Sequence, residues 1–412
     1  MRFVEYDDFG NLFNRSQLDQ TVSAAARVAA TGGVVVVYVH GWKHSAEPGD
    51  DDLMEFHMAM QHARTVYRKL SPSGKREILG IYVGWRGQSL EVPLLNNITF
   101  WNRKSTAQAV GDGAPFELFR KLANLRHDHP TSRLVLVGHS FGAAILYSSV
   151  AHSIMAQIVD DPEPGPGATT GESTLNDPKR WDMVVLINPA FEAMQLRPHL
   201  SLARSRNYLE NQLPHLIMIT TEGDWATRYF FPAGRYIHSM LNDYDDVESA
   251  AMYRSAVGHY IPFITHQLAV VPACPSPRIA NDAVVDGRRL NQPPAGPKSK
   301  YTCFNDARTM FSEPRKKADG SADVPAVQLT RCEEAYDCAR VAGEHFMEAP
   351  ADMPIWNIRA TREVMDDHSD IWNPTMHSLM VQLLLSIVER GTPAVTVPST
   401  PAQTPVANLS AP

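Results

Sequence analysis

The chain has 412 residues, of which 44% are hydrophobic and 20% charged, and its formal net charge at pH 7 is −7. These proportions are typical of a soluble globular protein, and the length allows either one large domain or several smaller ones. A negative net charge without a basic stripe argues against a nucleic-acid partner, because nothing would neutralise the phosphates.

Targeting signals and cysteines bear on the compartment. Residues 1–8 lack the apolar core of a secretory signal, and no uninterrupted apolar window is long enough to cross a bilayer, so we expect a soluble protein without stable membrane insertion. The four cysteines, at positions 274, 303, 332 and 338, fall in one segment and fit neither zinc nor redox spacing. The compartment stays open: cytoplasmic if these thiols are free, exported if they form disulfides.

The first third of the chain alternates apolar strands with helices. Residues 2–13 predict an antiparallel hairpin with a glycine-containing turn, and a helix follows over about 16–30. Residues 33–39 are a continuous β-branched run, the pattern of a strand buried on both faces of a parallel sheet, and 77–85 predict the next strand. Asp50, Asp51 and Asp52 are placed to cap a helix beginning near Leu53. The loop 96–101 is a candidate wall of a substrate pocket, although core packing explains its aromatic residues equally well.

The strongest motif is the pentapeptide 138–142, Gly-His-Ser-Phe-Gly, which lies between an apolar strand and a long apolar helix. Gly138 and Gly142 leave room for a sharp, strained turn. Such a turn lifts the Ser140 hydroxyl above the sheet and points the Phe141 amide to where a substrate oxyanion would develop. The order of strand, turn and helix therefore predicts a nucleophilic serine.

This arrangement resembles the α/β-hydrolase fold of serine esterases and lipases, over most of residues 1–225 and again over 353–390. The resemblance implies a mostly parallel central sheet flanked by helices, with a large insertion before the last strand. It also implies that the turn 40–42, His-Gly-Trp, supplies the second oxyanion amide from Trp42, and that His40 is structural. No cofactor or metal is implied.

The carboxylate and the base follow from the same resemblance. It places the carboxylate after the strand 215–220, where Asp224 is preferred to Glu222, whose side chain would point elsewhere from the turn. The chain order of serine, acid and histidine restricts the base to positions beyond Asp224. His368 is preferred because it follows the last predicted strand, 353–361. His377 falls inside the next helix pattern, and His259 is the alternative if that strand is wrong.

These elements predict a domain organisation and a function. Residues 1–227 form the first part of the core, 228–350 an insertion or cap, 351–390 the end of the core, and 391–412 a disordered Pro-rich tail. The predicted protein is an esterase or lipase that cleaves a small-molecule or lipid ester through an acyl-enzyme. A thioesterase, an amidase or peptidase, or an acyltransferase would use the same triad, and a catalytically silent fold that binds a ligand is the alternative from another class.

Overall fold

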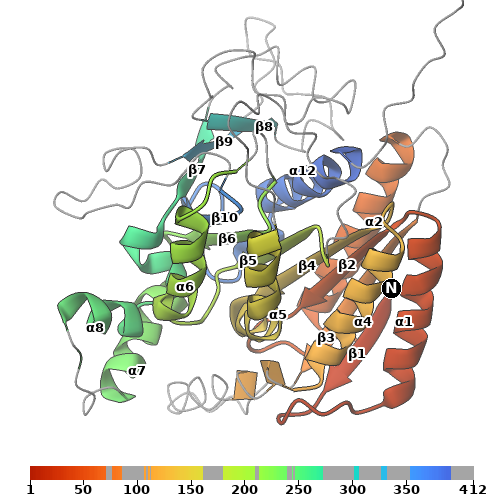
Figure 1. Cartoon of the computed structure of the whole chain (residues 1–412), viewed down its shortest axis with the longest axis horizontal. Helices are drawn as coiled ribbons and strands as arrows, with labels where there is room; N and C mark the ends of the chain where they lie inside the picture. The colour runs from red at the N-terminus through yellow and green to blue at the C-terminus, as the bar shows by residue number, and fades with distance from the viewer. Residues whose placement is uncertain are drawn as a thin grey trace, which may run out of the picture.

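The computed structural model describes residues 1–70, 77–85, 106–107, 110–111, 113–160, 180–208, 213–238, 244, 246–271, 301–305, 326–331 and 353–390. Within them, one sheet has the strand order β1-β3-β2-β4-β5-β6-β10-β7-β9-β8 (Figure 1). The predicted loop 96–101, the predicted tail 391–412, and Cys274, Cys332 and Cys338 lie outside these residues.

Eight neighbouring strands of the sheet run parallel, and the last two, β9 and β8, are antiparallel. In spatial order the parallel strands are β1 (Arg2–Tyr6), β3 (Ile78–Trp85), β2 (Val34–Val39), β4 (Arg133–His139), β5 (Met183–Ile187), β6 (Leu216–Thr221), β10 (Ile355–Ala360) and β7 (His266–Val271). The antiparallel pair is β9 (Ala326–Arg331) and β8 (Tyr301–Asn305).

Helices cover both faces of this sheet. One face packs against α1 (Arg15–Ala30), α4 (Pro115–Asp128), α5 (Ser140–Asp160) and α6 (Ala193–Arg204). The other packs against α2 (Asp51–Leu70) and α12 (Pro374–Arg390). The smaller elements are a π-helical turn (Ala226–Phe230), α7 (Phe231–His238), α8 (Val247–Arg254) and the 3-10 turns Val257–His259, Ile261–Phe263 and Asp370–Trp372. The predicted fold class, a mostly parallel sheet flanked by helices, is confirmed.

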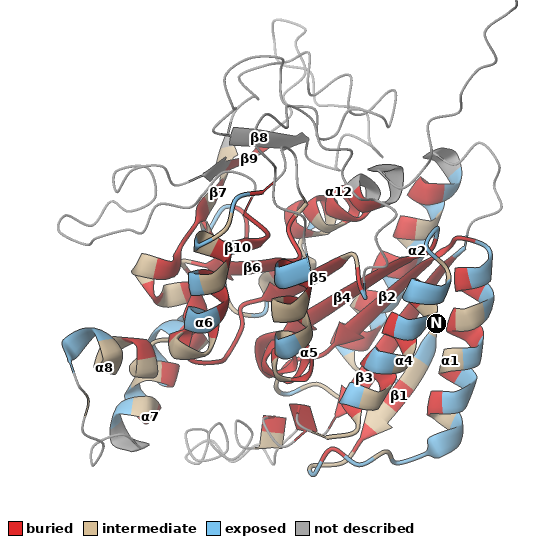
Figure 2. Ribbon diagram, viewed as in Figure 1, coloured by how far each residue is buried: buried red, intermediate tan, exposed pale blue. Residues whose placement is uncertain are grey.

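The central strands β2 and β4 are buried at every position and consist mostly of apolar residues, because both faces of the sheet are covered there, as Figure 2 shows. In β2, Val35, Val37 and Val39 face the α5 side, whereas Val34, Val36 and Tyr38 face the α2 side. Among the described helices, α5 alone has the length and hydropathy of a membrane span, and 56% of that window is buried inside the protein. It packs against β4, α4 and α6 as a core helix of this fold.

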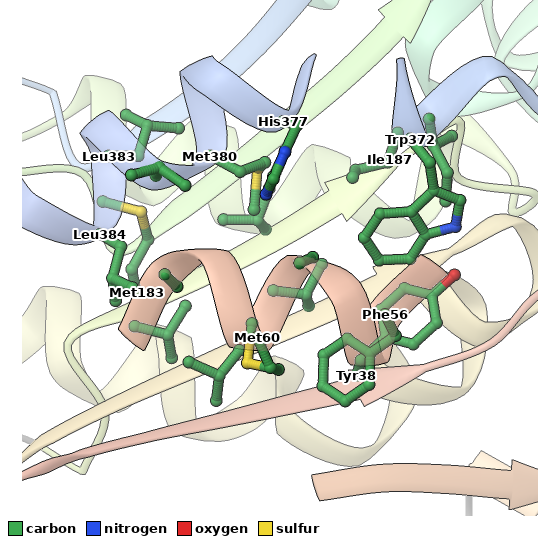
Figure 3. A pocket seen from close by; sticks show the side chains of 18 of the residues that line it. Tyr38, Phe56, Met60, Met183, Ile187, Trp372, His377, Met380, Leu383 and Leu384 are labelled. Atoms are coloured by element: carbon green, nitrogen blue, oxygen red, sulfur yellow. The ribbon is translucent and has the colours of Figure 1, made fainter. Parts of the chain in front are cut away.

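An apolar cavity of about 60 Å³ lies between the sheet and the two helices α2 and α12 (Figure 3). Phe56 and Met60 from α2, and Met380 and Leu384 from α12, are among its lining side chains. His377, which the sequence places inside the last helix, also lines it, and its Nδ1 lies 3.4 Å from Nδ1 of His62. Burial lowers the pKa of His377 to about 4.

The predicted hairpin over residues 2–13 is present only as a short antiparallel return at its turn, which contains Gly10. Residues 2–6 instead form β1, which pairs in parallel with β3, and the returning chain makes one antiparallel bridge, from Tyr6 to Leu12. The parallel register buries Val4 and Tyr6 in the core beneath α1, which a two-stranded hairpin on its own could not do.

The segment predicted as an insertion contributes strands to the central sheet. Its strand β7 pairs in parallel with β10, and β9 and β8 continue the sheet beyond β7. Cys303 belongs to β8. The part of this segment nearest the end of β6 instead forms the π-helical turn, α7, α8 and the turn Val257–His259. These elements follow the carboxyl end of β6. That end lies at the same edge of the sheet as the end of β4, after which Ser140 comes next in the chain.

Candidate active site

Ser140 stands at the junction of β4 and α5 with a left-handed backbone, φ 55°. A side chain on Gly138 would lie 2.7 Å from Cα of Ala143, and one on Gly142 would overlap the carbonyl oxygens of Val39 and His40. Each distance is shorter than van der Waals contact, so both positions require glycine for steric reasons. The strained serine turn predicted from the pentapeptide is therefore present.

The structure brings Ser140 and two distant side chains into one hydrogen-bonded line. His368 Nε2 lies 2.8 Å from Ser140 Oγ, and His368 Nδ1 lies 2.8 Å from Asp224 Oδ1. Because an ionised carboxylate can only accept hydrogen bonds, the ring proton lies on Nδ1, and this N–H donates a hydrogen bond to Asp224. The neutral ring then presents the lone pair of Nε2 to the serine hydroxyl, which is the arrangement a general base requires.

The competing acid and base residues lie elsewhere. Glu222 is partly exposed and pairs with Arg359 at 3.3 Å. His377 lies in α12 and contacts His62 rather than the serine. His259 lies close to the acid without touching Ser140: its Nε2 is 3.0 Å from the hydroxyl of Thr227, a neighbour of Asp224.

Asp224 is fully buried, yet it is held in its charged form. Burial alone would raise its pKa, but the charge and hydrogen bond of His368, the charge of His259 and the hydroxyl of Thr227 lower that pKa to about 2. The amide of Thr227 also donates to Asp224 Oδ1 at 3.0 Å. Asp224 thus precedes the helical segment 226–238 as a capping carboxylate, a position that favours negative charge.

The His368 loop is fixed by two residues that the sequence did not indicate. His139 Nε2 lies 2.8 Å from the His368 carbonyl oxygen, and Asn188 Nδ2 donates to the same oxygen at 2.9 Å. The Asn188 side-chain oxygen accepts from the amide of Thr221 at 3.1 Å. Burial lowers the pKa of His139 to about 3, so its ring stays neutral and its Nε2–H can donate. His139 is the last residue of β4, and Asn188 directly follows β5 at the same edge of the sheet; this position is the signal that could have marked them.

The acid turn and the histidine loop meet with almost no space between them. A side chain on Gly223 would overlap the carbonyl oxygen of Asp366 and lie 2.9 Å from its carbonyl carbon. The hydroxyl of Thr221 donates to the carbonyl oxygen of Met365 in the same interface. Glycine at 223 therefore permits the approach that places Asp224 beside His368.

The turn 40–42 packs directly against the serine turn. A side chain on Gly41 would lie 3.0 Å from Cβ of Ser140 and 2.6 Å from Nδ1 of His139. His40 is fully buried and its ring is held by two bonds: Nδ1 donates to the Gly41 carbonyl at 2.8 Å, and Nε2 accepts from the Trp85 amide at 3.1 Å. His40 therefore shapes this turn, and Gly41 of the turn lies against the side chains of Ser140 and His139. Trp42 follows in that turn, and Phe141 is the second residue of α5.

Taken together, these groups can deprotonate a hydroxyl and stabilise the imidazolium that results. Among the described residues, no group of three or more His, Cys, Asp or Glu side chains is arranged to hold a metal ion.

Comparison with known proteins gives little further information. No protein-family model and no curated protein sequence matches the chain. An acetyl xylan esterase structure aligns at 12% identity and a TM-score of 0.18, over 38% of this chain and 63% of its own. The phospholipase PlaB from Legionella pneumophila aligns at 13% identity and a TM-score of 0.20, over 58% of this chain and 47% of its own. A second structure of PlaB, in complex with thio-NAD, aligns at 10% identity and a TM-score of 0.20, over 80% of this chain and 93% of its own. Similarity this low does not assign an activity.

Proposed function

We propose that the protein is a serine hydrolase that cleaves carboxylic esters through an acyl-enzyme intermediate. The observation that carries the proposal is the pair of 2.8 Å contacts that join Ser140 Oγ to His368 Nε2 and His368 Nδ1 to Asp224 Oδ1. A serine hydroxyl is a weak nucleophile unless a base removes its proton, and a base in the correct tautomer needs a third group to orient it. All three groups are present in the required order along the chain.

In the proposed reaction, Ser140 Oγ attacks the ester carbonyl while His368 Nε2 takes the hydroxyl proton. His368 then gives that proton to the leaving alkoxide as the carbon–oxygen bond of the ester breaks, and the acyl group stays on Ser140. Water repeats the sequence with His368 again as base, which releases the acid and restores the hydroxyl. Asp224 stays ionised throughout and stabilises the imidazolium, which its low pKa of about 2 supports.

The amides of Trp42 and Phe141 are the proposed oxyanion donors. Support comes from the contact between their two turns, since Gly41 lies against Ser140 and Gly142 lies against the end of β2. The two segments are therefore adjacent around the serine. A preorganised amide donor of this kind contributes about 3 to 4 kcal/mol of transition-state stabilisation in other enzymes.

The proposed substrate is a small-molecule or lipid ester, and the reaction needs no cofactor. Turnover of matched acetyl ester, thioester and anilide substrates tests the proposal on the wild type and on Ser140→Ala. We expect the ester to be cleaved fastest and Ser140→Ala to lose at least about 10³-fold in kcat. Faster cleavage of the thioester or the anilide would instead assign a thioesterase or an amidase. No turnover of any of the three by the folded wild type would leave a binding protein on this fold.

A further inference from the structure

The carboxylate of Asp224 is held on both of its oxygens. Oδ1 receives His368 Nδ1 at 2.8 Å and the Thr227 amide at 3.0 Å, and Oδ2 receives the Thr227 hydroxyl. Thr227 is fully buried, so no water replaces it at Oδ2. One threonine therefore fixes the plane in which the carboxylate faces His368.

The proton count then assigns a direction to the contact with His259. The Thr227 hydroxyl has one hydrogen, and it is donated to Asp224, which can only accept. The 3.0 Å contact between Thr227 Oγ1 and His259 Nε2 must therefore be a bond in which Nε2–H donates to Oγ1. His259 therefore donates to Thr227, and Thr227 donates to Asp224. His368 donates to the same carboxylate.

The fold holds His259 in place for this contact. Its 3-10 turn is bound on two sides: Asn357 Nδ2 in β10 donates to the Val257 carbonyl at 3.1 Å, and the Val257 amide donates to the Phe191 carbonyl at 3.0 Å. A side chain on Gly258 would overlap the Thr220 side chain in β6, so the turn lies directly on the sheet.

Burial, reinforced by nearby positive charges, keeps the ring of His259 neutral near neutral pH. Burial lowers the pKa of His259 to about 4; the Asp224 carboxylate opposes this shift, whereas Arg228, Arg359 and His368 add to it. Arg359 is in turn paired with Glu222 at 3.3 Å. Near neutral pH the ring therefore has a single proton, which the geometry places on Nε2.

We infer that Thr227 and His259 are positioning residues of this site: His259 orients the Thr227 hydroxyl, and Thr227 holds Asp224 in the plane that serves His368. The inference rests on the proposed function, because it gives the pair a role only if His368 acts as the base for Ser140. Without the Thr227 hydroxyl, Asp224 Oδ2 is buried without a donor. Because this bond no longer offsets its negative charge, the carboxylate attracts the imidazolium of His368 more strongly. The carboxylate is also less well oriented toward His368.

The test uses the full chain and four variants. Thr227→Val removes the hydroxyl at nearly constant shape, and Thr227→Ser keeps it. His259→Phe removes the donor, and His259→Gln keeps an N–H that can reach Thr227. His199→Phe is the matched control, because His199 is a buried histidine bonded to the Tyr147 hydroxyl outside this site. The readouts are kcat on an acetyl ester and the pH at which fluorophosphonate labelling of Ser140 falls to half.

We expect Thr227→Val to lower kcat by about ten- to a hundredfold, the equivalent of one hydrogen bond to a charged group. His259→Phe removes a bond between two uncharged groups and should lower kcat by about two- to tenfold. The half-labelling pH should rise by about half a unit or more in Thr227→Val, since the imidazolium is better stabilised. Thr227→Ser and His259→Gln should stay near wild type, and His199→Phe should change stability alone. A folded Thr227→Val with wild-type kcat and half-labelling pH would overturn the inference.

Nitrogen-15 NMR of the histidine rings separates this inference from the proposed function. A neutral His259 protonated on Nε2 supports the network, and one protonated on Nδ1 overturns it, whether or not the protein hydrolyses esters. Absence of both labelling and turnover in the wild type would reject the proposed function instead, and with it the role inferred for the pair.

Discussion

Gly223→Ala tests whether the close approach of two backbone segments creates the Asp224–His368 pair. The new methyl group would overlap the Asp366 carbonyl oxygen and lie 2.9 Å from its carbon. Backbone atoms cannot rotate away, so reaching an ordinary separation of about 3.5 Å requires the histidine loop to retreat by more than about 1 Å. The 2.8 Å bond from His368 Nδ1 to Asp224 would then exceed hydrogen-bonding distance.

The expected loss in kcat is large. A misplacement of about 1 Å can cost about 10²-fold, and loss of the orienting carboxylate costs about 10⁴-fold in serine proteases, so we expect a loss between these values. The assay is kcat on an acetyl ester, measured per folded molecule after the unfolding free energy has been determined in urea. Loss of stability is also expected, about 1 to 3 kcal/mol, because the interface is overpacked.

Gly33→Ala is the matched control for this variant. A side chain there would lie 2.6 Å from the Glu77 carbonyl oxygen, so it produces a similar backbone clash, but at the opposite edge of the sheet before β2 begins. It should lose stability while each folded molecule keeps the wild-type kcat. A folded Gly223→Ala with wild-type kcat would refute the reasoning, because the pair would then form without the close approach.

Three further predictions concern stability. The Asp182 side chain is only 9% exposed and accepts from Arg126 Nε and from the Leu134 amide, each at 2.8 Å. Asp182→Ala should therefore cost about 3 to 5 kcal/mol in urea unfolding and leave the folded kcat unchanged. Leu384→Ala, which enlarges the apolar cavity, should cost about 2 to 5 kcal/mol in the same assay, and a cost below 1 kcal/mol would mean that the site collapses. The pKa of His139, about 3, lies below the value near 6.5 of an unfolded histidine, so the unfolded chain binds the extra proton first as pH falls. The unfolding free energy should therefore drop by roughly 1 to 2 kcal/mol for this residue between pH 7 and 5, and His139→Gln should flatten that dependence.

The sequence predicted the parts of this site that depend on local patterns. The pentapeptide around Ser140 encodes the strained turn through its glycines, and the apolar runs before and after it encode a strand and a helix. The resemblance to the α/β-hydrolase fold, with its chain order of serine, acid and histidine, then brought Asp224 and His368 forward as candidates. The structure places His368 beside Ser140, and Asp224 beside His368.

The residues that the sequence did not mark act between elements distant in the chain. Gly223 matters because Asp366 lies against it, and Asn188 because the His368 carbonyl lies within its reach. Neither contact has a local signature. Thr227 lies three positions after an aspartate, a spacing typical of helix capping, so its second role at Oδ2 was not visible.

Strand pairing was the other feature that local patterns could not determine. Residues 2–13 have the alternation and turn of a hairpin, but β1 gains a longer parallel ladder with β3 and buries Val4 and Tyr6 there. Similarly, β9 and β8 extend the sheet beyond β7. In both places the partner of a strand was decided by which edge of the sheet was available.

The measurement that tests the central claim most directly is fluorophosphonate labelling, located by peptide mass spectrometry. It is made on the folded wild type, on His368→Ala and on His57→Ala, a control that removes an exposed histidine of α2. The account predicts a single label on Ser140 in the wild type and in His57→Ala, and none in His368→Ala. An unlabelled Ser140 in the folded wild type, or equal labelling in His368→Ala, would contradict the claim that His368 activates this serine.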